Sequence, residues 1–264
     1  MAESSAYIIG IIVMSIAGYY VRSLSLSGAV AAFITGCLIA LGFRWQGLLI
    51  LGAFFASSSF WSKYKKQQKS KLDGMLQKGD RRDWVQVAAN GSAASIAALL
   101  FYITGQDIWM VAFLAAIAAA NADTWASEIG VLSKRRPFYI LTGKKVEKGT
   151  SGAVSLLGTF ASFAGSFFVA LVAMLVLHFN SIFVFWLIVF AGFVGSVVDT
   201  LLGATIQARY TCDACGLATE KTVHCGRPAR LVKGKAWLNN DAVNIASIFI
   251  AAIMAVIVFI IIEI

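Results

Sequence analysis

Eight apolar segments, each about as long as a membrane helix, dominate this chain. We place them near residues 6–22, 27–42, 46–62, 85–104, 107–126, 152–177, 182–206 and 243–262. A helix needs about 20 predominantly apolar residues to cross a hydrocarbon core about 30 Å thick. Because backbone polar groups in lipid must be hydrogen-bonded within the protein, these segments are expected to be helices. The sequence therefore predicts an all-α fold, a polytopic transmembrane helix bundle of about eight spans that forms a single domain over residues 1–264.

The composition excludes an ordinary soluble domain. Hydrophobic residues make up 59% of the chain and charged residues 13%, whereas a soluble domain is about half apolar and about a quarter charged. Pro137 and Pro228 both fall in polar loops, so we expect no span to carry a proline kink. The first five residues lack the basic region of a cleaved signal peptide, and the first apolar run is therefore interpreted as a retained span.

The basic residues predict the orientation. Of the 22 Lys and Arg residues, 20 lie in three loops near 62–83, 131–150 and 207–238. These loops follow the third, fifth and seventh spans, which puts them on one side of the membrane. The positive-inside rule makes that side cytosolic and places both termini outside. Topology and anionic lipid account for the net charge of +9, and no nucleic-acid partner is expected, since the basic residues flank spans.

Acidic residues within the spans or at their ends are the strongest functional signal. Ionisable groups at membrane depth are costly and usually functional. Each of these carboxylates has small polar neighbours on the same or an adjacent helical stripe, and all of them lie toward the cytosolic side. Interhelical packing explains a single glycine or serine equally well, but it explains three aspartates at one depth poorly. The residues concerned are Asn121, Asp123, Ser127 and Glu128, then Ser196 and Asp199, and then Asn240, Asp241 and Asn244.

Converging carboxylates point to a divalent cation. Without a partner they repel one another, and Mg²⁺ is usually held by one or two carboxylates together with substrate phosphates. We therefore expect Asp123, Asp199 and Asp241 to bind Mg²⁺. The loop that returns into the sixth span offers an anion site, because a glycine-rich turn at a helix start presents backbone N–H groups. The residues of this turn and of the basic stretch before it are Lys144, Lys145, Gly149, Thr150, Ser151 and Gly152.

These features together suggest a polyphosphate ligand at the cytosolic membrane boundary. No GxxxxGK[ST] sequence is present, so a nucleotide would be bound by a different device from the P-loop.

A cysteine motif in the last cytosolic loop is a candidate zinc site. Cys212-Asp-Ala-Cys215 precedes His224-Cys225, and together they could supply three thiolates and an imidazole to a structural Zn²⁺. Adjacent His224 and Cys225 can reach one ion only through a strained local turn. The alternative is a set of free cytosolic thiols, since disulfides are rare on that side. Cys37, inside the second span, is expected to serve packing.

Four ordered segments resemble one family of membrane proteins. They read NADTWASEIGVLSK, KGTSGAVSLLGT, GSVVDTLLGATIQARY and NNDAVNIAS. They are similar to motifs of the integral-membrane family first catalogued as a domain of unknown function, which includes plant phytyl-phosphate kinases and transmembrane protein 19. The resemblance covers nearly the whole chain. More distantly, Asp123-Thr-Trp-Ala-Ser-Glu-Ile-Gly130, followed by Lys145 and Thr150-Ser151, is similar to the D-x-x-A-S-x-x-G…K-x-x-G-S pattern of CTP-dependent phytol and dolichol kinases, with a different spacing between its two parts.

The resemblance implies phosphoryl transfer from a nucleoside triphosphate, preferably CTP, to a membrane isoprenoid or its monophosphate. Asn121 and Asn240 would orient the Mg²⁺ ligands, and the lysines and the 149–152 turn would neutralise the transferring phosphoryl group. An alcohol acceptor would need a base, for which Glu128 or Asp123 is the candidate. The remaining candidate binding residues are Ser127, Ser196, Gln207 and Asn244.

Three alternatives stay open at this point. An ion-coupled transporter also uses intramembrane acids, but it predicts polar residues through the membrane and on both faces. A cytidylyltransferase would use the same metal and CTP, and would release pyrophosphate in place of CDP. A kinase could also act on another membrane lipid. The sequence leaves the oligomeric state, including a homodimer, undecided.

Overall fold

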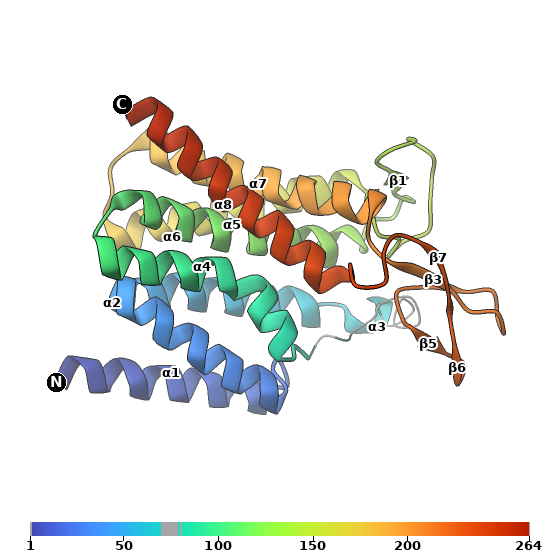
Figure 1. The fold of residues 1–264 in the computed structure, drawn as a ribbon, viewed down its shortest axis with the longest axis horizontal. Coiled ribbons are helices and arrows are strands. Elements are labelled where there is room, and N and C mark those ends of the chain that lie inside the picture. Colours follow the sequence, from blue (N-terminus) through green and yellow to red (C-terminus); the bar gives the residue numbers. More distant parts are fainter. Residues whose placement is uncertain (1, 70–78, 80, 264) are drawn as a thin grey trace.

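The protein is a bundle of long helices with short strands gathered at one end. The computed structural model describes residues 2–69, 79 and 81–263. Both termini lie at one end of the bundle, and the labelled strands and α3 lie at the other, which we call the loop end (Figure 1). The helices are α1 (Ala2–Tyr20), α2 (Leu26–Lys63), α3 (Lys66–Lys69), α4 (Trp84–Thr104), α5 (Asp107–Gly130), α6 (Leu156–Leu177), α7 (Ile182–Thr205) and α8 (Asn240–Glu263).

Helix α2 is a hairpin of two helical arms. Its backbone is non-helical at Arg44, where φ is 48° and ψ is −141°. Gly47 packs against Ile39, eight positions earlier, which a continuous helix would separate by about 12 Å. At the loop end, Lys63 donates a hydrogen bond to the carbonyl of Val21, so the last turn of α2 lies near its start. This break falls between the second and third predicted spans.

Helix α5 is the centre of the bundle. It contacts α2, α4, α6, α7 and α8, and every residue from 111 to 122 is buried. Most of this stretch is alanine. Small side chains let neighbouring backbones approach closely, which is how membrane helices pack without a hydrophobic driving force. α5 therefore holds its polar C-terminal turns, which begin at Asn121, in a fixed position among five neighbours.

Side-chain caps set several helix starts. Asp83 and Gln86 form a capping box at the N-terminus of α4, with the Gln86 N–H donating to Asp83 at 2.9 Å. Ser155 caps α6 by accepting from the N–H of Gly158 at 3.1 Å. Such caps satisfy backbone N–H groups that have no partner within the helix. The Ser155 cap explains why α6 begins after the 149–152 turn. The predicted span, 152–177, began within that turn.

The connections at the loop end contain short antiparallel sheets that the all-helical prediction did not include. β1 pairs with β2, β5 pairs with β6, and β3 lies between β4 and β7. The strands are β1 (Phe138–Tyr139), β2 (Ala153–Val154), β3 (Arg209–Thr211), β4 (Ala218–Thr219), β5 (Val223–His224), β6 (Arg227–Pro228) and β7 (Arg230–Lys233). Strands this short carry too little alternation to be recognised from sequence.

The helical, membrane-spanning character of the fold is confirmed. Among the described residues, six helices have the length and hydropathy of a membrane span when α2 is counted once, and α1 contains a shorter apolar helix over Ala6–Tyr20. Counting the two arms of α2 separately and including α1 would give eight. The number of spans and the side on which the termini lie stay predictions.

Candidate functional site

A large polar cavity opens at the loop end of the bundle. It has a volume of about 810 Å³ and is lined by residues from α2, α4, α5, α6, α7 and α8 and from the connecting segments. Most of the predicted site residues line this one space. They are Asp123, Ser127, Glu128, Gly149, Thr150, Ser151, Gly152, Ser196, Asp199, Gln207, Asn240, Asp241 and Asn244.

Asp199 is held by two donors from the neighbouring helix α8. The hydroxyl of Ser247 donates to Asp199 Oδ2 at 3.1 Å. The side-chain amide of Asn244, in the orientation that satisfies both of its polar atoms, donates to the same oxygen at 2.9 Å. Both hydrogen bonds use the same carboxylate oxygen, Oδ2, and Asp199 lines the cavity. The pairing fixes the position of the carboxylate between α7 and α8.

Asp123 and Asp199 form the carboxylate pair of the cavity. Their charges are close enough to repel each other, and the Ser196 side chain lies beside Asp123. Asp241 lines the same cavity and is 4% exposed. Which of these three aspartates would bind Mg²⁺ stays a prediction, and Asp123 and Asp199 are the two whose charges interact.

Both carboxylate oxygens of Glu128 are bound by other side chains of the protein. Lys69 forms an ion pair with Glu128 Oε2 at 2.6 Å, and the two side chains are only 11% and 25% exposed. The hydroxyl of Ser62 donates to Oε1 at 2.8 Å. With both oxygens bound, Glu128 is a poor candidate for a general base, because a base needs a free lone pair directed at the substrate. It instead ties α5 to α2 and α3 at the cavity.

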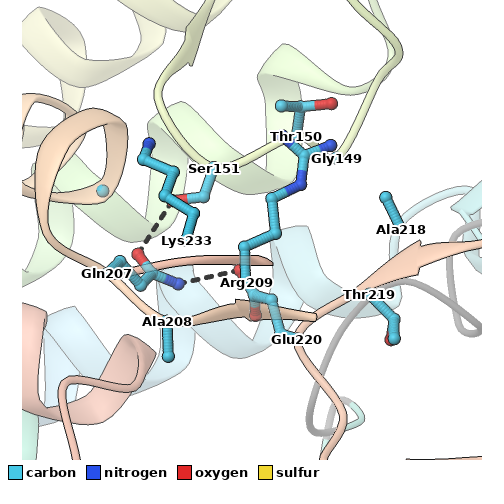
Figure 2. Close-up of a pocket in the computed structure, with 11 residues that line it drawn as sticks. Gly149, Thr150, Ser151, Gln207, Ala208, Arg209, Ala218, Thr219, Glu220 and Lys233 are labelled. Carbon is cyan, nitrogen blue, oxygen red and sulfur yellow. Dashed lines mark hydrogen bonds between the residues drawn. The ribbon is translucent and has the colours of Figure 1, made fainter. Parts of the chain in front are cut away.

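The 149–152 turn packs on the C-terminal end of α7. Gln207 joins this turn to the connection between α7 and α8: the Ser151 hydroxyl donates to Gln207 Oε1 at 2.8 Å, and Gln207 Nε2 donates to Glu220 at 2.9 Å (Figure 2). A side pocket of about 10 Å³, room for a water molecule, lies beside these residues. The turn precedes β2 and lies outside the N-terminus of α6. Any anion it binds is thus held by the turn itself and not by a helix dipole.

Three predicted residues do not line the cavity. Asn121 is fully buried and joins three helices: Oδ1 accepts from Ser57 and Ser58, and Nδ2 donates to the carbonyl of Gly165 at 2.8 Å. Lys144 and Lys145 are exposed on the hairpin between β1 and β2, on the outside of the loop end. The structure brings neither lysine to the carboxylates. Sequence spacing could not reveal this, because the β1–β2 hairpin that carries the lysines is formed by strands too short to be recognised from sequence.

Several lining residues were not among the predicted set. Cationic side chains at the cavity wall come from α3, from the start of α4 and from the loops, and Glu220 adds a carboxylate. A helical stripe cannot find them, since they lie in connections whose path is set by tertiary contacts. The concentration of Lys and Arg in the three loops was the sequence signal that could have indicated these cationic lining residues. The additional lining residues are Lys66, Lys69, Arg82, Glu220 and Lys221.

The cysteine motif forms a separate, compact cluster beside the cavity. The ligand atoms of Cys212, Cys215, His224 and Cys225 all lie within 4.8 Å of one another. The four cysteines of the chain are free thiols. A side-chain hydrogen bond with His224 lowers the pKa of the Cys212 thiol to about 6. A side-chain hydrogen bond with Cys215 raises the pKa of Cys225 to about 11.

Chemically, the cavity presents carboxylates from α5, α7 and α8 together with cations and a glycine turn from the loops. Such a set can hold a divalent cation and a polyanion at once. The carboxylates bind the cation, and the cationic side chains and the turn bind the polyanion.

Comparison with known proteins places the chain in a family. A family model described as Integral membrane protein DUF92 matches residues 9–252. The chain is 33% identical over 270 residues to Protein PGR of Arabidopsis thaliana, covering 91% of this chain and 92% of that protein. It is 28% identical over 240 residues to an uncharacterized membrane protein of Methanocaldococcus jannaschii, covering 90% and 87% respectively.

A further relative is Protein VTE6, chloroplastic, of Arabidopsis thaliana. The identity is 27% over 241 residues, covering 89% of this chain and 65% of that protein. No solved structure matches the chain. The match of the family model to residues 9–252 extends from α1 into α8 and includes every wall of the cavity. This chain therefore belongs to the DUF92 family and is a multi-pass integral membrane protein.

Proposed function

We propose that this protein is a membrane lipid kinase that transfers a phosphoryl group from a nucleoside triphosphate, preferably CTP, to an isoprenoid monophosphate. The observation that carries the proposal is the single cavity of about 810 Å³ in which carboxylates, cations and a glycine turn meet at the loop end. The motif resemblance to a family with phytyl-phosphate kinases supports the choice of reaction. The basic loops support a cytosolic active face.

The carboxylates fit Mg²⁺. Asp123 and Asp199 are the pair that would hold it, and Asp241 lines the same space. Two repelling carboxylates beside phosphates form the usual protein contribution to such a site. When bound, Mg²⁺ supplies positive charge to the phosphate oxygens. Ser247 and Asn244 would keep Asp199 oriented toward it.

The loops supply the phosphate-facing side of the cavity. The turn from Gly149 to Gly152 and the side chain of Lys148 line the wall formed by the connections. Phosphoryl transfer needs in-line positioning and charge stabilisation more than covalent help from the protein. Backbone N–H groups and lysines fixed before the reaction provide both without reorganisation. Gln207 would hold this wall in place through Ser151 and Glu220.

The acceptor enters from the lipid side. Phe193 and Val197 of α7 add apolar surface to the cavity wall, which suits a polyprenyl tail lying between helices. A lipid monophosphate already carries an ionised oxygen, so its attack on the γ-phosphoryl needs no general base. An alcohol would need one, and Asp123 is better placed than Glu128, whose two oxygens accept from Lys69 and Ser62. The cavity thus favours a monophosphate acceptor.

The transporter alternative fits the bundle less well. A transport path needs polar groups across the whole membrane. Residues 111–120 of the central helix α5 are buried and apolar, and the lining of the cavity in α5 starts only at Asp123. The cytidylyltransferase alternative would use the same site, and its product distinguishes it.

Incubation of the purified protein with labelled CTP or ATP and a panel of prenyl alcohols and monophosphates tests the proposal. We expect a labelled lipid diphosphate and release of CDP or ADP. Asp123→Asn should abolish turnover in a folded protein, while Asp107→Asn, at the exposed far end of the same helix, should not. Release of pyrophosphate would indicate a cytidylyltransferase instead. Retained turnover in Asp123→Asn would refute the metal role.

A further inference from the structure

The connection from α7 to α8 contains two β-hairpins whose turns face each other. Cys212 and Cys215 lie in the turn between β3 and β4, His224 ends β5, and Cys225 begins the turn between β5 and β6. The hairpins are not one continuous sheet: β3 pairs with β4 and β7, and β5 pairs only with β6 among the described strands. Something other than strand pairing must hold the second hairpin against the first.

Backbone hydrogen bonds close the first turn. The carbonyl of Cys212 accepts from the N–H of Gly216 at 2.7 Å, and the Cys212 N–H donates to the carbonyl of Leu217 at 3.0 Å. Gly216 has φ +73°, a left-handed conformation that closes the turn at no steric cost. This turn directs the side chains of Cys212 and Cys215 to the same side.

The second turn has the strained backbone that adjacent His224 and Cys225 need in order to reach one ion. Adjacent ligands can converge only if the backbone between them is unusual, and Cys225 has φ +51°, followed by Gly226 at +72°. Positive φ in a residue other than glycine is costly and persists where the surroundings enforce it. Here it brings Cys225 Sγ to 3.2 Å from the Nδ1 of its neighbour His224. The strained turn that a shared ion requires is present.

The distances match a tetrahedral zinc site. With Zn–S bonds of about 2.3 Å and Zn–N bonds of about 2.0 Å, tetrahedral ligand atoms lie about 3.5 to 3.8 Å apart. Cys215 Sγ lies 3.5 Å from His224 Nδ1, and all four ligand atoms lie within 4.8 Å. Three sulfurs and one imidazole nitrogen in a tetrahedron favour Zn²⁺ over Mg²⁺ or Ca²⁺, which prefer oxygen ligands.

We propose that Cys212, Cys215, His224 and Cys225 bind one structural Zn²⁺ ion that holds the two hairpins together beside the cavity. The segment between the two ligand pairs contains Glu220 and Lys221, which line the cavity. Glu220 also accepts from Gln207, which in turn accepts from Ser151 of the glycine turn. The zinc ion thereby stabilises the wall that faces the carboxylates. The proposal does not depend on the reaction that the cavity carries out.

Metal analysis of the full-length protein, purified in detergent without added metal, tests the site. We expect about one zinc per chain in the unaltered protein, and a loss of about tenfold in Cys215→Ser and in His224→Ala, since each removes one of four ligands. Cys37→Ser is the matched control, because Cys37 lies in α2 outside the cluster, and it should retain its zinc. A zinc-free unaltered protein, or an unchanged zinc content in both variants, would overturn the proposal.

A second measurement keeps the test valid if the variants fail to fold. The unaltered protein is treated with a chelator, and hydrogen exchange is followed across the chain. Exchange should increase over residues 209–233 and stay unchanged in α5, and Zn²⁺ should reverse the increase. Co²⁺ added to the stripped protein should give the absorption bands of a tetrahedral thiolate site, while Mg²⁺ should not. No change in exchange on chelation would contradict a structural role for the ion.

Discussion

At the scale of single residues, the carboxylate of Asp199 depends on its donors. Ser247 and Asn244 both reach it from α8, and both bind Oδ2. A hydrogen bond to a charged group contributes about 1.5 to 3 kcal/mol. Together the two donors fix a carboxylate that lines the cavity and couple α7 to α8. Ser247 is therefore a positioning residue, although it does not itself line the cavity.

Ser247→Ala should weaken Mg²⁺ binding without unfolding the protein. Loss of one donor to Asp199 releases its orientation, and a loss of about 1.4 kcal/mol corresponds to a tenfold weaker apparent affinity. The readouts are the Mg²⁺ dependence of turnover and the increase in melting temperature that Mg²⁺ produces. Thr205→Ala is the control, since the Thr205 hydroxyl donates to the carbonyls of Leu201 and Leu202 in its own helix. An unchanged Mg²⁺ dependence in Ser247→Ala would show that Asp199 is not a ligand.

At the scale of elements, the glycine turn and α7 fit together closely. Gly152 has φ +82°, and a Cβ added there would lie 2.6 Å from Ala204 Cα and 2.9 Å from its nitrogen. These are backbone atoms of a packed helix and cannot move aside cheaply. The turn is thus held against the end of α7, next to Gln207, and this contact places Ser151 in the cavity wall.

Gly152→Ala should displace the turn, whereas Gly143→Ala should not. Gly143 also has positive φ, +65°, but a Cβ there meets nothing within 4 Å. Both substitutions carry the left-handed penalty of about 1 kcal/mol, and only Gly152→Ala adds the collision with Ala204. Melting temperatures should therefore fall by a few degrees for Gly143→Ala and distinctly more for Gly152→Ala, which should also lose turnover. Equal shifts in the two variants would contradict the close packing.

These elements also show what sequence patterns could and could not predict. The interruption near Arg44 separated two apolar runs, and the structure turns the chain there. The span topology predicted Asp123, Asp199 and Asp241 at the same end of their helices, and all three line one cavity; their binding of a metal stays a prediction. Helical stripes could not tell that Asn121 contacts α2 and α6, since its neighbours Ser57 and Gly165 come from distant segments. The pairing of Lys69 with Glu128 was invisible for the same reason.

At the scale of the whole molecule, the basic loops and the candidate site lie at the same end of the bundle. The strands, the cysteine cluster and the basic connections lie at the loop end, and both termini lie at the other (Figure 1). The connections at the far end are short, as between Thr104 and Asp107 and between Leu177 and Ile182. Under the proposed function, the loop end is the place where a water-soluble nucleotide would meet a lipid. The side of the membrane on which this end lies would decide which nucleotide pool the cavity meets.

Reporter fusions test the orientation. Alkaline phosphatase is active only outside the cytosol, and a fluorescent protein of the green type folds in the cytosol. Because positive loops stay inside, the phosphatase fused after Ile264 should be active and the fluorescent protein fused there should be dark. Truncation after Lys235 removes α8 and leaves the reporter at the loop end, so the matched fusion should reverse both signals. Fluorescence from the full-length fusion would put the carboxylate cavity on the outer face, where cytosolic CTP cannot reach it.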